Sequence, residues 1–174
     1  GLAAMGARAV PELITRLSSD NEDLRRNAGY GLAAIGQAAV PALEEAAGAE
    51  RAETRVAAVD ALGEMGRPAS PAIGTLQTAS KDEDSVVRTK ASCALSNVGD
   101  AAATAIPSLI DALEDSEPWV VRHSLLAMAR LGSQAAEAVP RLAPYLNHEN
   151  RYVRGKVVLA LQRIGTEEAK DMLI

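Results

Sequence analysis

The sequence predicts an all-α solenoid, a linear stack of about five helix pairs with partial repeats at both ends. Similar phrases ending in glycine recur at intervals of 30 and then 33 residues, at Gly6, Gly36, Gly66, Gly99, Gly132 and Gly165. A proline follows each of the first five glycines, and apolar residues precede the last five at helical spacing. Chains with such internal repetition fold as stacked units, because one unit cannot bury its apolar face alone.

The residues before each glycine predict the second helix of each pair, which we call helix B. Apolar or small residues lie 12, 8, 5, 4 and 1 positions before the glycine. In the third repeat they are Val87, Ala91, Ala94, Leu95 and Val98, and in the last they are Val153, Val157, Ala160, Leu161 and Ile164. Steps of four, three and one place them on one face of a helix, whereas a strand needs steps of two. The glycine then ends the helix.

The proline after each glycine predicts the first helix of each pair, helix A. Proline is favoured in the first turn of a helix, because its missing N–H would have no partner there. These prolines are Pro11, Pro41, Pro71, Pro107 and Pro140. We therefore expect repeats at residues 7–36, 37–66, 67–99, 100–132 and 133–165. Residues 1–6 would be the tail of a preceding helix B, and residues 166–174 a terminal helix.

Composition limits the function classes. The chain has 174 residues, no Phe, one Trp and three Tyr, so its core must be mostly aliphatic. The net charge of −5 argues against a chain built to coat nucleic acid. The only cysteine, Cys93, rules out an internal disulfide and fits a reducing compartment. No apolar run is long enough to span a bilayer, so we expect a soluble cytoplasmic protein.

Each helix B carries an arginine near its start, with an acid five residues earlier. The pairs are Asp20 and Arg25, Glu50 and Arg55, Glu83 and Arg88, Glu117 and Arg122, and Glu149 and Arg154. In one interpretation the acid only caps the positive end of helix B. In the other, each arginine forms a structural ladder with acids and turn carbonyls of its own and the neighbouring repeat. Arg122 lies one residue closer to its glycine, so the fourth helix B has lost a residue or starts later.

The phrases "LRRNAGYGLAAIG", "VVRTKASCALSNVG" and "YVRGKVVLALQRIG", with the preceding acid and proline-started helix, resemble HEAT repeats. They are most similar to the short repeats of phycobilisome lyase subunits. The resemblance implies a right-handed solenoid whose B helices line a concave side, and whose usual role is to hold other macromolecules. It is specific for the fold and says little about function.

No group of residues predicts catalysis. His148 and Glu149 resemble the His-Glu pairs of HEAT-repeat iron hydroxylases, but those enzymes need several pairs, and one supplies too few ligands. We therefore expect no catalytic residue, no metal and no cofactor. Two functions stay open: a non-catalytic protein-binding scaffold, and a subunit of a bilin lyase, which the resemblance alone implies.

The surface of the B helices holds the candidate partner-binding residues. Residues 1–87 carry 8 basic and 13 acidic side chains, whereas residues 88–174 carry 10 of each. In the second half, basic residues alternate with leucine on the side that faces away from the apolar stripe. These candidates are Arg122, Leu126, Arg130, Lys156, Leu159 and Arg163. Arginine beside apolar anchors is typical of protein interfaces, so we expect an acidic protein or peptide partner, and no nucleic acid or membrane.

The first residues predict a further contact. "GLAAMG" matches the end of a helix B, and Leu2 and Met5 would be left uncovered there. Such an apolar patch drives association, so we expect self-association through the N-terminal end. We also expect the chain to be part of a longer solenoid.

Overall fold

The computed structural model describes the backbone of residues 2–174, and the side chains from residue 6 onward. This part of the chain forms eleven α-helices and contains no strand. The A helices are α1 (Leu2–Leu17), α3 (Val40–Ala47), α5 (Ile73–Ala79), α7 (Ile106–Asp111) and α9 (Val139–Leu142). The B helices are α2 (Glu22–Ile35), α4 (Ala52–Met65), α6 (Ser85–Asn97), α8 (Pro118–Leu131) and α10 (Arg151–Ile164), and the short α11 (Glu167–Asp171) follows them.

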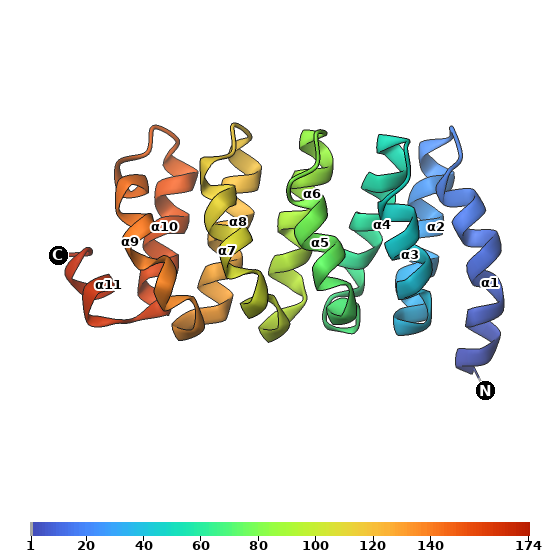
Figure 1. The fold of residues 1–174 in the computed structure, drawn as a ribbon, viewed down its shortest axis with the longest axis horizontal. Coiled ribbons are helices and arrows are strands. Elements are labelled where there is room, and N and C mark those ends of the chain that lie inside the picture. Colours follow the sequence, from blue (N-terminus) through green and yellow to red (C-terminus); the bar gives the residue numbers. More distant parts are fainter. Residues whose placement is uncertain (1) are drawn as a thin grey trace.

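The helix pairs stack in one direction and form two layers, one of A helices and one of B helices (Figure 1). Each B helix packs against the B helix of the next repeat. We call the outer surface of α2, α4, α6, α8 and α10 the B-helix face. The predicted α-solenoid is confirmed. None of the described helices combines the length and apolar character needed to cross a bilayer.

The predicted glycines end all five B helices. Gly36, Gly66, Gly99, Gly132 and Gly165 have positive φ values between 57° and 77°. Residues with a Cβ atom rarely adopt this conformation, which explains why glycine recurs at these places. A 3-10 segment that leads into the next A helix begins at Gly36, Gly99 and Gly132, and directly after Gly66.

The core is continuous and aliphatic, as predicted. The apolar positions of α6 and α10 are all buried, with at most 3% exposure. Leu32, Leu62, Leu95 and Leu161 occupy equivalent positions in four B helices and are at most 1% exposed. The pattern is weaker in α2, where Leu24 is 44% exposed and Ile35 is only partly buried.

The prolines follow the prediction in three repeats. Pro41, Pro107 and Pro140 are the second residues of α3, α7 and α9. Pro71 instead lies inside the 3-10 segment Arg67–Ala72, which precedes α5. After the first repeat the A helices have between 4 and 8 residues and are shorter than the B helices.

The expected break at Gly6 is wrong. α1 runs without interruption from Leu2 to Leu17, and Pro11 lies inside it. Gly6 is not among the glycines with positive φ. A Cβ atom added to it would lie 3.4 Å from Cγ1 of Ile35 in α2, so this part of α1 lies against α2. Residues 2–6 of the phrase "GLAAMG" are thus part of an A helix here and not the end of a B helix. The side chains of Leu2 and Met5, on which the expected self-association depends, lie outside the described residues.

A close contact between α4 and α6 offers a test of the packing. A Cβ atom on Gly63 of α4 would lie 3.2 Å from the Cβ and 3.3 Å from the Cα of Ala94 in α6. We expect Gly63→Ala to lower the free energy of unfolding by about 1–3 kcal/mol, because the two helices would have to separate. Gly155→Ala is the matched control in α10, since nothing lies within 4 Å of its added Cβ.

The control should raise the free energy of unfolding by up to about 1 kcal/mol through helix propensity. Urea denaturation followed by circular dichroism measures both. If Gly63→Ala is neutral or stabilising, the close contact between α4 and α6 is not tight in solution.

Candidate functional site

The arginines near the starts of the B helices bind the turns between helices A and B. In Arg88, Nη1 donates to the main-chain oxygens of Asp82 and Glu83 at 2.9 and 3.0 Å. The same pair of bonds is formed by Arg25, Arg55 and Arg154. The predicted acid therefore contributes its carbonyl oxygen to the arginine of its own repeat. This differs from the simple capping interpretation, in which only its carboxylate acts.

The carboxylates that bind these arginines come from the next repeat. Asp82 accepts hydrogen bonds from Nε and Nη2 of Arg55, both at 2.8 Å. Asp115 accepts the equivalent bonds from Arg88 at 2.7 and 3.2 Å. All four side chains are at most 17% exposed. Sequence reasoning missed both aspartates, although their spacing of one repeat was a visible signal.

The ladder is complete only in the middle of the stack. Ala49 and His148 occupy the positions equivalent to Asp82 and Asp115, so no carboxylate is present there. His148 instead accepts a hydrogen bond from the Asn150 amide through Nδ1 at 3.0 Å. The two aspartates accept the same bond from the amide two residues ahead. The role of His148 is thus to order a turn.

The first two repeats are joined by a different contact. Arg51 forms an ion pair with Asp20 at 2.7 Å and donates to the main-chain oxygen of Ser18 at 3.2 Å. Asp20 was expected to pair with Arg25, which takes only its carbonyl oxygen. The ladder therefore changes its chemistry from one repeat to the next.

The ladder predicts a loss of stability in acid. Burial raises the pKa of Asp82 and Asp115, but hydrogen bonds from arginine and from a backbone amide outweigh it and leave each pKa below its ordinary value of 3.8. A carboxyl whose pKa is lower in the folded state stabilises the fold at neutral pH and loses that effect as pH falls below about 4. Urea midpoints should therefore fall between pH 7 and pH 3.

The double variant Asp82→Asn with Asp115→Asn is the control for this prediction. It should be less stable at pH 7 and should lose less stability on acidification than the wild-type chain. An equal loss in both proteins would show that other carboxyl groups cause the acid sensitivity.

Arg122 does not belong to the ladder, which corrects that assignment. α8 has 14 residues, as do α4 and α10, so the fourth helix B has lost nothing. The ladder position in α8 is occupied by the buried Val121, and Arg122 is its neighbour on the B-helix face. Its guanidinium carbon lies 4.1 Å from the centre of the Trp119 ring and 5.2 Å from that of Tyr152. Glu117 caps α8 by accepting a hydrogen bond from the Trp119 amide.

Rows of equivalent residues run across α6, α8 and α10, and all of their members are partly or fully exposed. We call this part of the B-helix face the basic strip. Its four rows are Val86, Trp119 and Tyr152; Lys90, His123 and Lys156; Cys93, Leu126 and Leu159; and Asn97, Arg130 and Arg163. Aromatic or apolar rows thus alternate with basic or polar rows. The six predicted binding residues all lie in this strip or, as Arg122 does, between its rows.

Two aromatic residues of the strip were missed by sequence reasoning. Trp119 is 51% exposed and Tyr152 is 54% exposed, in a chain that has only four aromatic residues. Both lie 13 positions before their closing glycine, next to the apolar position of the core. The rarity of aromatic residues and their equal spacing could have identified them.

The electrostatic environment of the strip is positive. Burial lowers the pKa of His123, and the nearby charges of Arg122, Arg130, Lys156 and Lys90 lower it further. Arg122, Lys156 and Arg163 form no ion pair with any described residue. Their charges are therefore available to a partner.

Arg130 has a structural contact as well. Its Nη1 donates to the main-chain oxygen of Ser96 at 2.6 Å and to Oδ1 of Asn97 at 2.7 Å. Arg130 therefore connects α8 to α6 while its side chain stays exposed on the B-helix face. Variants at this position need a stability measurement beside any binding measurement.

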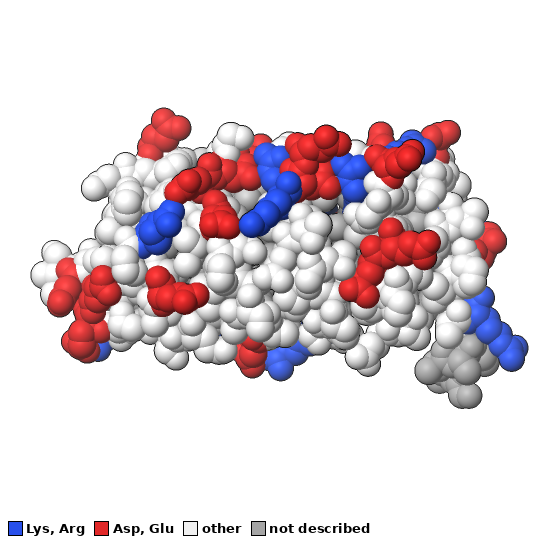
Figure 2. All heavy atoms as spheres, viewed as in Figure 1, with Lys and Arg blue, Asp and Glu red and all other residues white. Residues whose placement is uncertain are grey.

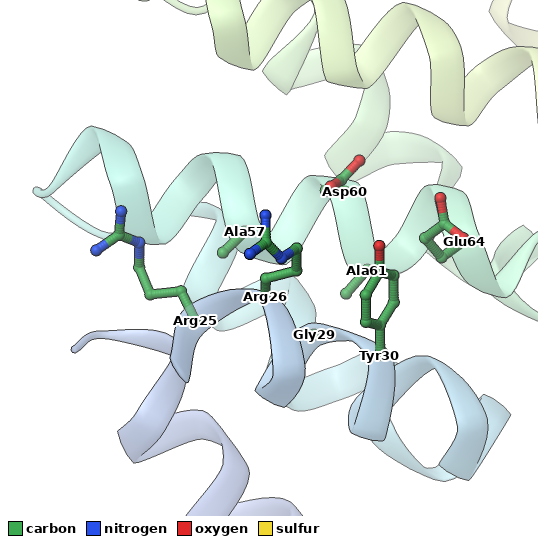
Figure 3. A pocket seen from close by; sticks show the side chains of 8 residues that line it. All are labelled: Arg25, Arg26, Gly29, Tyr30, Ala57, Asp60, Ala61 and Glu64. Atoms are coloured by element: carbon green, nitrogen blue, oxygen red, sulfur yellow. The ribbon is translucent and has the colours of Figure 1, made fainter. Parts of the chain in front are cut away.

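The B-helix face is hollowed over α2, α4 and α6, with a volume of about 540 Å³. Figure 3 shows Arg26 and Tyr30 of α2 beside Asp60 and Glu64 of α4 in a neighbouring part of this region. Charges here are neutralised within the chain. Arg26 pairs with Glu22 and Asp23, and Lys90 pairs with Asp60 at 2.8 Å. The hollow therefore presents balanced charge, unlike the strip.

The face that Figure 2 shows has its Lys, Arg, Asp and Glu side chains mainly along one edge. This edge carries the turns between helices A and B, where the ladder lies (Figure 1). The middle of this face is largely free of charge.

A family model described as HEAT repeats matches residues 10–73, 49–129 and 106–174. The chain belongs to the HEAT-repeat family. This confirms the resemblance on which the expectation of an α-solenoid partly rests. Among curated proteins, no significant match is found.

Solved structures of three kinds share the fold. A chain of the complex of CpcE and CpcF of phycocyanin lyase from Nostoc sp. PCC7120 is 21% identical, with a TM-score of 0.76 over 88% of this HEAT-repeat chain and 98% of that chain. A computationally designed armadillo repeat protein for modular peptide recognition is 20% identical, with a TM-score of 0.70 over 94% and 86%. Kap95p, solved in complex with RanGDP, is 17% identical, with a TM-score of 0.73 over 98% and 26%.

Proposed function

We propose that this HEAT-repeat chain is a non-catalytic scaffold that holds an acidic segment of a partner protein on the basic strip. The observation that carries the proposal is the combination of unneutralised positive charge with exposed aromatic and aliphatic side chains on α8 and α10. Interfaces take much of their affinity from such arginine and aromatic anchors. Basic residues around them steer an acidic partner and select it over others.

The charge balance favours the strip over the hollow on α2, α4 and α6. In the hollow, Lys90 and Arg26 already have acidic partners within the chain. A ligand there would have to displace these contacts. In the strip, Arg122, Lys156 and Arg163 offer their charge without such a loss.

Site-specific photo-crosslinking tests where the partner binds. A benzoylphenylalanine residue at Leu159 of the strip is compared with one at Glu45, an exposed position on the A helix α3. We expect a defined crosslinked protein, identified by mass spectrometry as having an acidic segment at the crosslink, only from position 159. Crosslinking from position 45 alone would place the partner on the A helices and contradict the proposal.

A second candidate is a subunit of a bilin lyase, which the similarity to the CpcE and CpcF complex favours. In this case the B-helix face would help to hold a tetrapyrrole or the protein that carries it. Mixing the purified chain with phycocyanobilin and recording the absorbance separates the two candidates. A red-shifted, structured spectrum supports the lyase class, and an unchanged spectrum supports the scaffold.

A further inference from the structure

Arg122 is held by aromatic rings on the surface of the strip. Its guanidinium contacts Trp119 and Tyr152, and its buried Nε atom has no hydrogen-bond partner. Buried polar atoms are almost always paired in native proteins, so an unpaired one requires an explanation. The rings offset part of the cost through cation–π attraction, but they leave the charge of the guanidinium without a counterion.

The equivalent residue in α2 shows what is missing. Arg26 occupies the same position in its helix as Arg122 does in α8, and it pairs with Glu22 and Asp23. The residues at the corresponding places in α8 are Pro118 and Trp119. An aromatic ring thus replaces an acid beside the arginine. The counterion of Arg122 must come from outside this stretch of chain.

The groups around Arg122 strengthen this requirement. Lys156 lies in the adjacent row beside His123 and has no ion pair with a described residue, whereas Lys90 on the other side of His123 is paired with Asp60. Arg151 also lies over the ring of Tyr152, with its guanidinium carbon 4.7 Å from the ring centre. Positive charge therefore surrounds a partly apolar surface. Rings that exclude water make an ion pair at this place stronger than at an open surface.

We infer that Arg122 is the contact for a partner carboxylate, with Trp119 and Tyr152 as the apolar surface against which the neighbouring partner residue packs. The occupant is an extended peptide segment that places an Asp or Glu next to an aromatic or aliphatic residue. This inference rests on the proposed function and names the chemistry of its partner. The terminal nitrogens of a guanidinium form a planar fork that matches a carboxylate, and the rings fix the plane of that fork.

Acidic residues at the edge of the strip favour a peptide over nucleic acid. Glu117 and Glu149 lie two and three residues before Trp119 and Tyr152, and Asp84 precedes Val86 in α6. A single-stranded nucleic acid could also stack its bases on exposed aromatic rings. Its continuous phosphate charge would be repelled by these three acids more strongly than the one or two carboxylates of a peptide, which can bind at Arg122 away from them.

Phage display of random 12-residue peptides against the full chain tests the inference. We expect the selected peptides to be enriched in Asp or Glu next to an aromatic or aliphatic residue. One such peptide is then titrated against the wild-type chain, Arg122→Gln and Arg26→Gln. Arg122→Gln should weaken binding by at least about tenfold, which is typical of a central interface residue. Arg26→Gln, the matched control, should change it less than about twofold, as surface charges outside an interface do.

Measurements of stability, of two ring variants and of oligonucleotide binding distinguish a lost contact from a lost fold and a peptide from a nucleic acid. The urea midpoint of Arg122→Gln should fall only slightly, because the side chain loses its contacts with two rings but no ion pair with a described residue. A loss of binding is then not a loss of fold. Trp119→Ala and Tyr152→Ala should each weaken binding to a similar degree. A fluorescent dT20 oligonucleotide should bind weakly and should not compete with the peptide.

Several results would overturn the inference. One is an equal loss from Arg122→Gln and Arg26→Gln, and another is selected peptides without acidic residues. Competition by dT20 that depends on Trp119 would assign the strip to nucleic acid. If Arg122→Gln binds normally while Arg130→Glu with Arg163→Glu does not, the proposed function stands and the role of Arg122 falls. If neither variant loses binding, the proposed function falls as well.

Discussion

Reversing Arg130 and Arg163 to glutamate should weaken partner binding by well over tenfold. The two arginines occupy equivalent positions on α8 and α10, at the end of the basic strip. The change removes two favourable contacts and also places two like charges opposite an acidic partner. Isothermal titration calorimetry with the partner, or with a selected acidic peptide, measures the change directly.

The control is the double variant Arg8→Glu with Arg67→Glu, which changes the net charge by the same amount. Arg8 lies on α1, and Arg67 starts the 3-10 segment before α5 and lies against Gly99, beyond the end of α6. Neither belongs to the outer surface of α8 or α10. This control should bind almost as the wild-type chain does. Equal losses in both double variants would show a general effect of charge and no specific surface. Arg163→Glu alone is a useful third variant, because Arg130 also binds Ser96 and Asn97.

Replacing Arg88 by alanine should lower the free energy of unfolding by about 1–3 kcal/mol, the cost of leaving buried hydrogen-bonding groups unpaired. Arg88 binds two turn carbonyls and the carboxylate of Asp115, which is 11% exposed. Without the arginine, that carboxylate keeps its burial and loses its main partner. Urea denaturation measures the loss.

A double-mutant cycle with Asp115→Ala separates the two kinds of contact. The loss in the free energy of unfolding should be smaller in the double variant than the two single losses added together, because each single change already breaks the same ion pair. Arg154→Ala is a comparison, since Arg154 binds two turn carbonyls and has no equivalent aspartate. A loss of only a few tenths of a kcal/mol for Arg88→Ala, of the size that exposed pairs show, would contradict a structural role for the ladder.

The fold could be predicted because its signals are local and repeated. The closing glycines, the apolar steps of α6 and α10 and the prolines at the starts of three A helices all act within one repeat. The same pattern occurs in each repeat, so it can be recognised even where one repeat is irregular. Pro11 inside α1 shows the limit: the continuity of a helix through Gly6 depends on its packing against α2, which no local pattern encodes.

The contacts between repeats were harder to predict. Asp82 and Asp115 bind arginines 27 residues earlier in the chain, and that distance has meaning only when the stacking of repeats is known. Four of the five predicted acids contribute carbonyl oxygens to the arginine of their own repeat, whereas Glu117 caps α8. The ladder interpretation, with turn carbonyls and an acid of the neighbouring repeat, thus fits Arg55 and Arg88, but the buried aspartates that supply the short carboxylate contacts were not identified.

The composition of the candidate surface was predictable in part. Alternation of basic residues and leucine marked α8 and α10, and the structure places these residues on one face. The sequence placed Arg122 both in the ladder and on this face. The structure places it on the face only, because Val121 occupies the ladder position and Arg122 is the next residue. Trp119 and Tyr152 were not predicted, because they lie 13 positions before the closing glycine, in the first turn of their B helices, and the compared surface positions lie later in each helix.

The single tryptophan of the chain allows occupancy of the basic strip to be measured directly. Trp119 lies in the basic strip and is 51% exposed, so its fluorescence reports occupancy of the strip without a label. The chain is titrated with a binding peptide that lacks tryptophan, while calorimetry follows binding independently. We expect a blue shift of the emission and protection from acrylamide quenching, both saturating with the binding curve. Full binding by calorimetry with unchanged Trp119 emission and quenching would show that the partner binds elsewhere and would contradict the account.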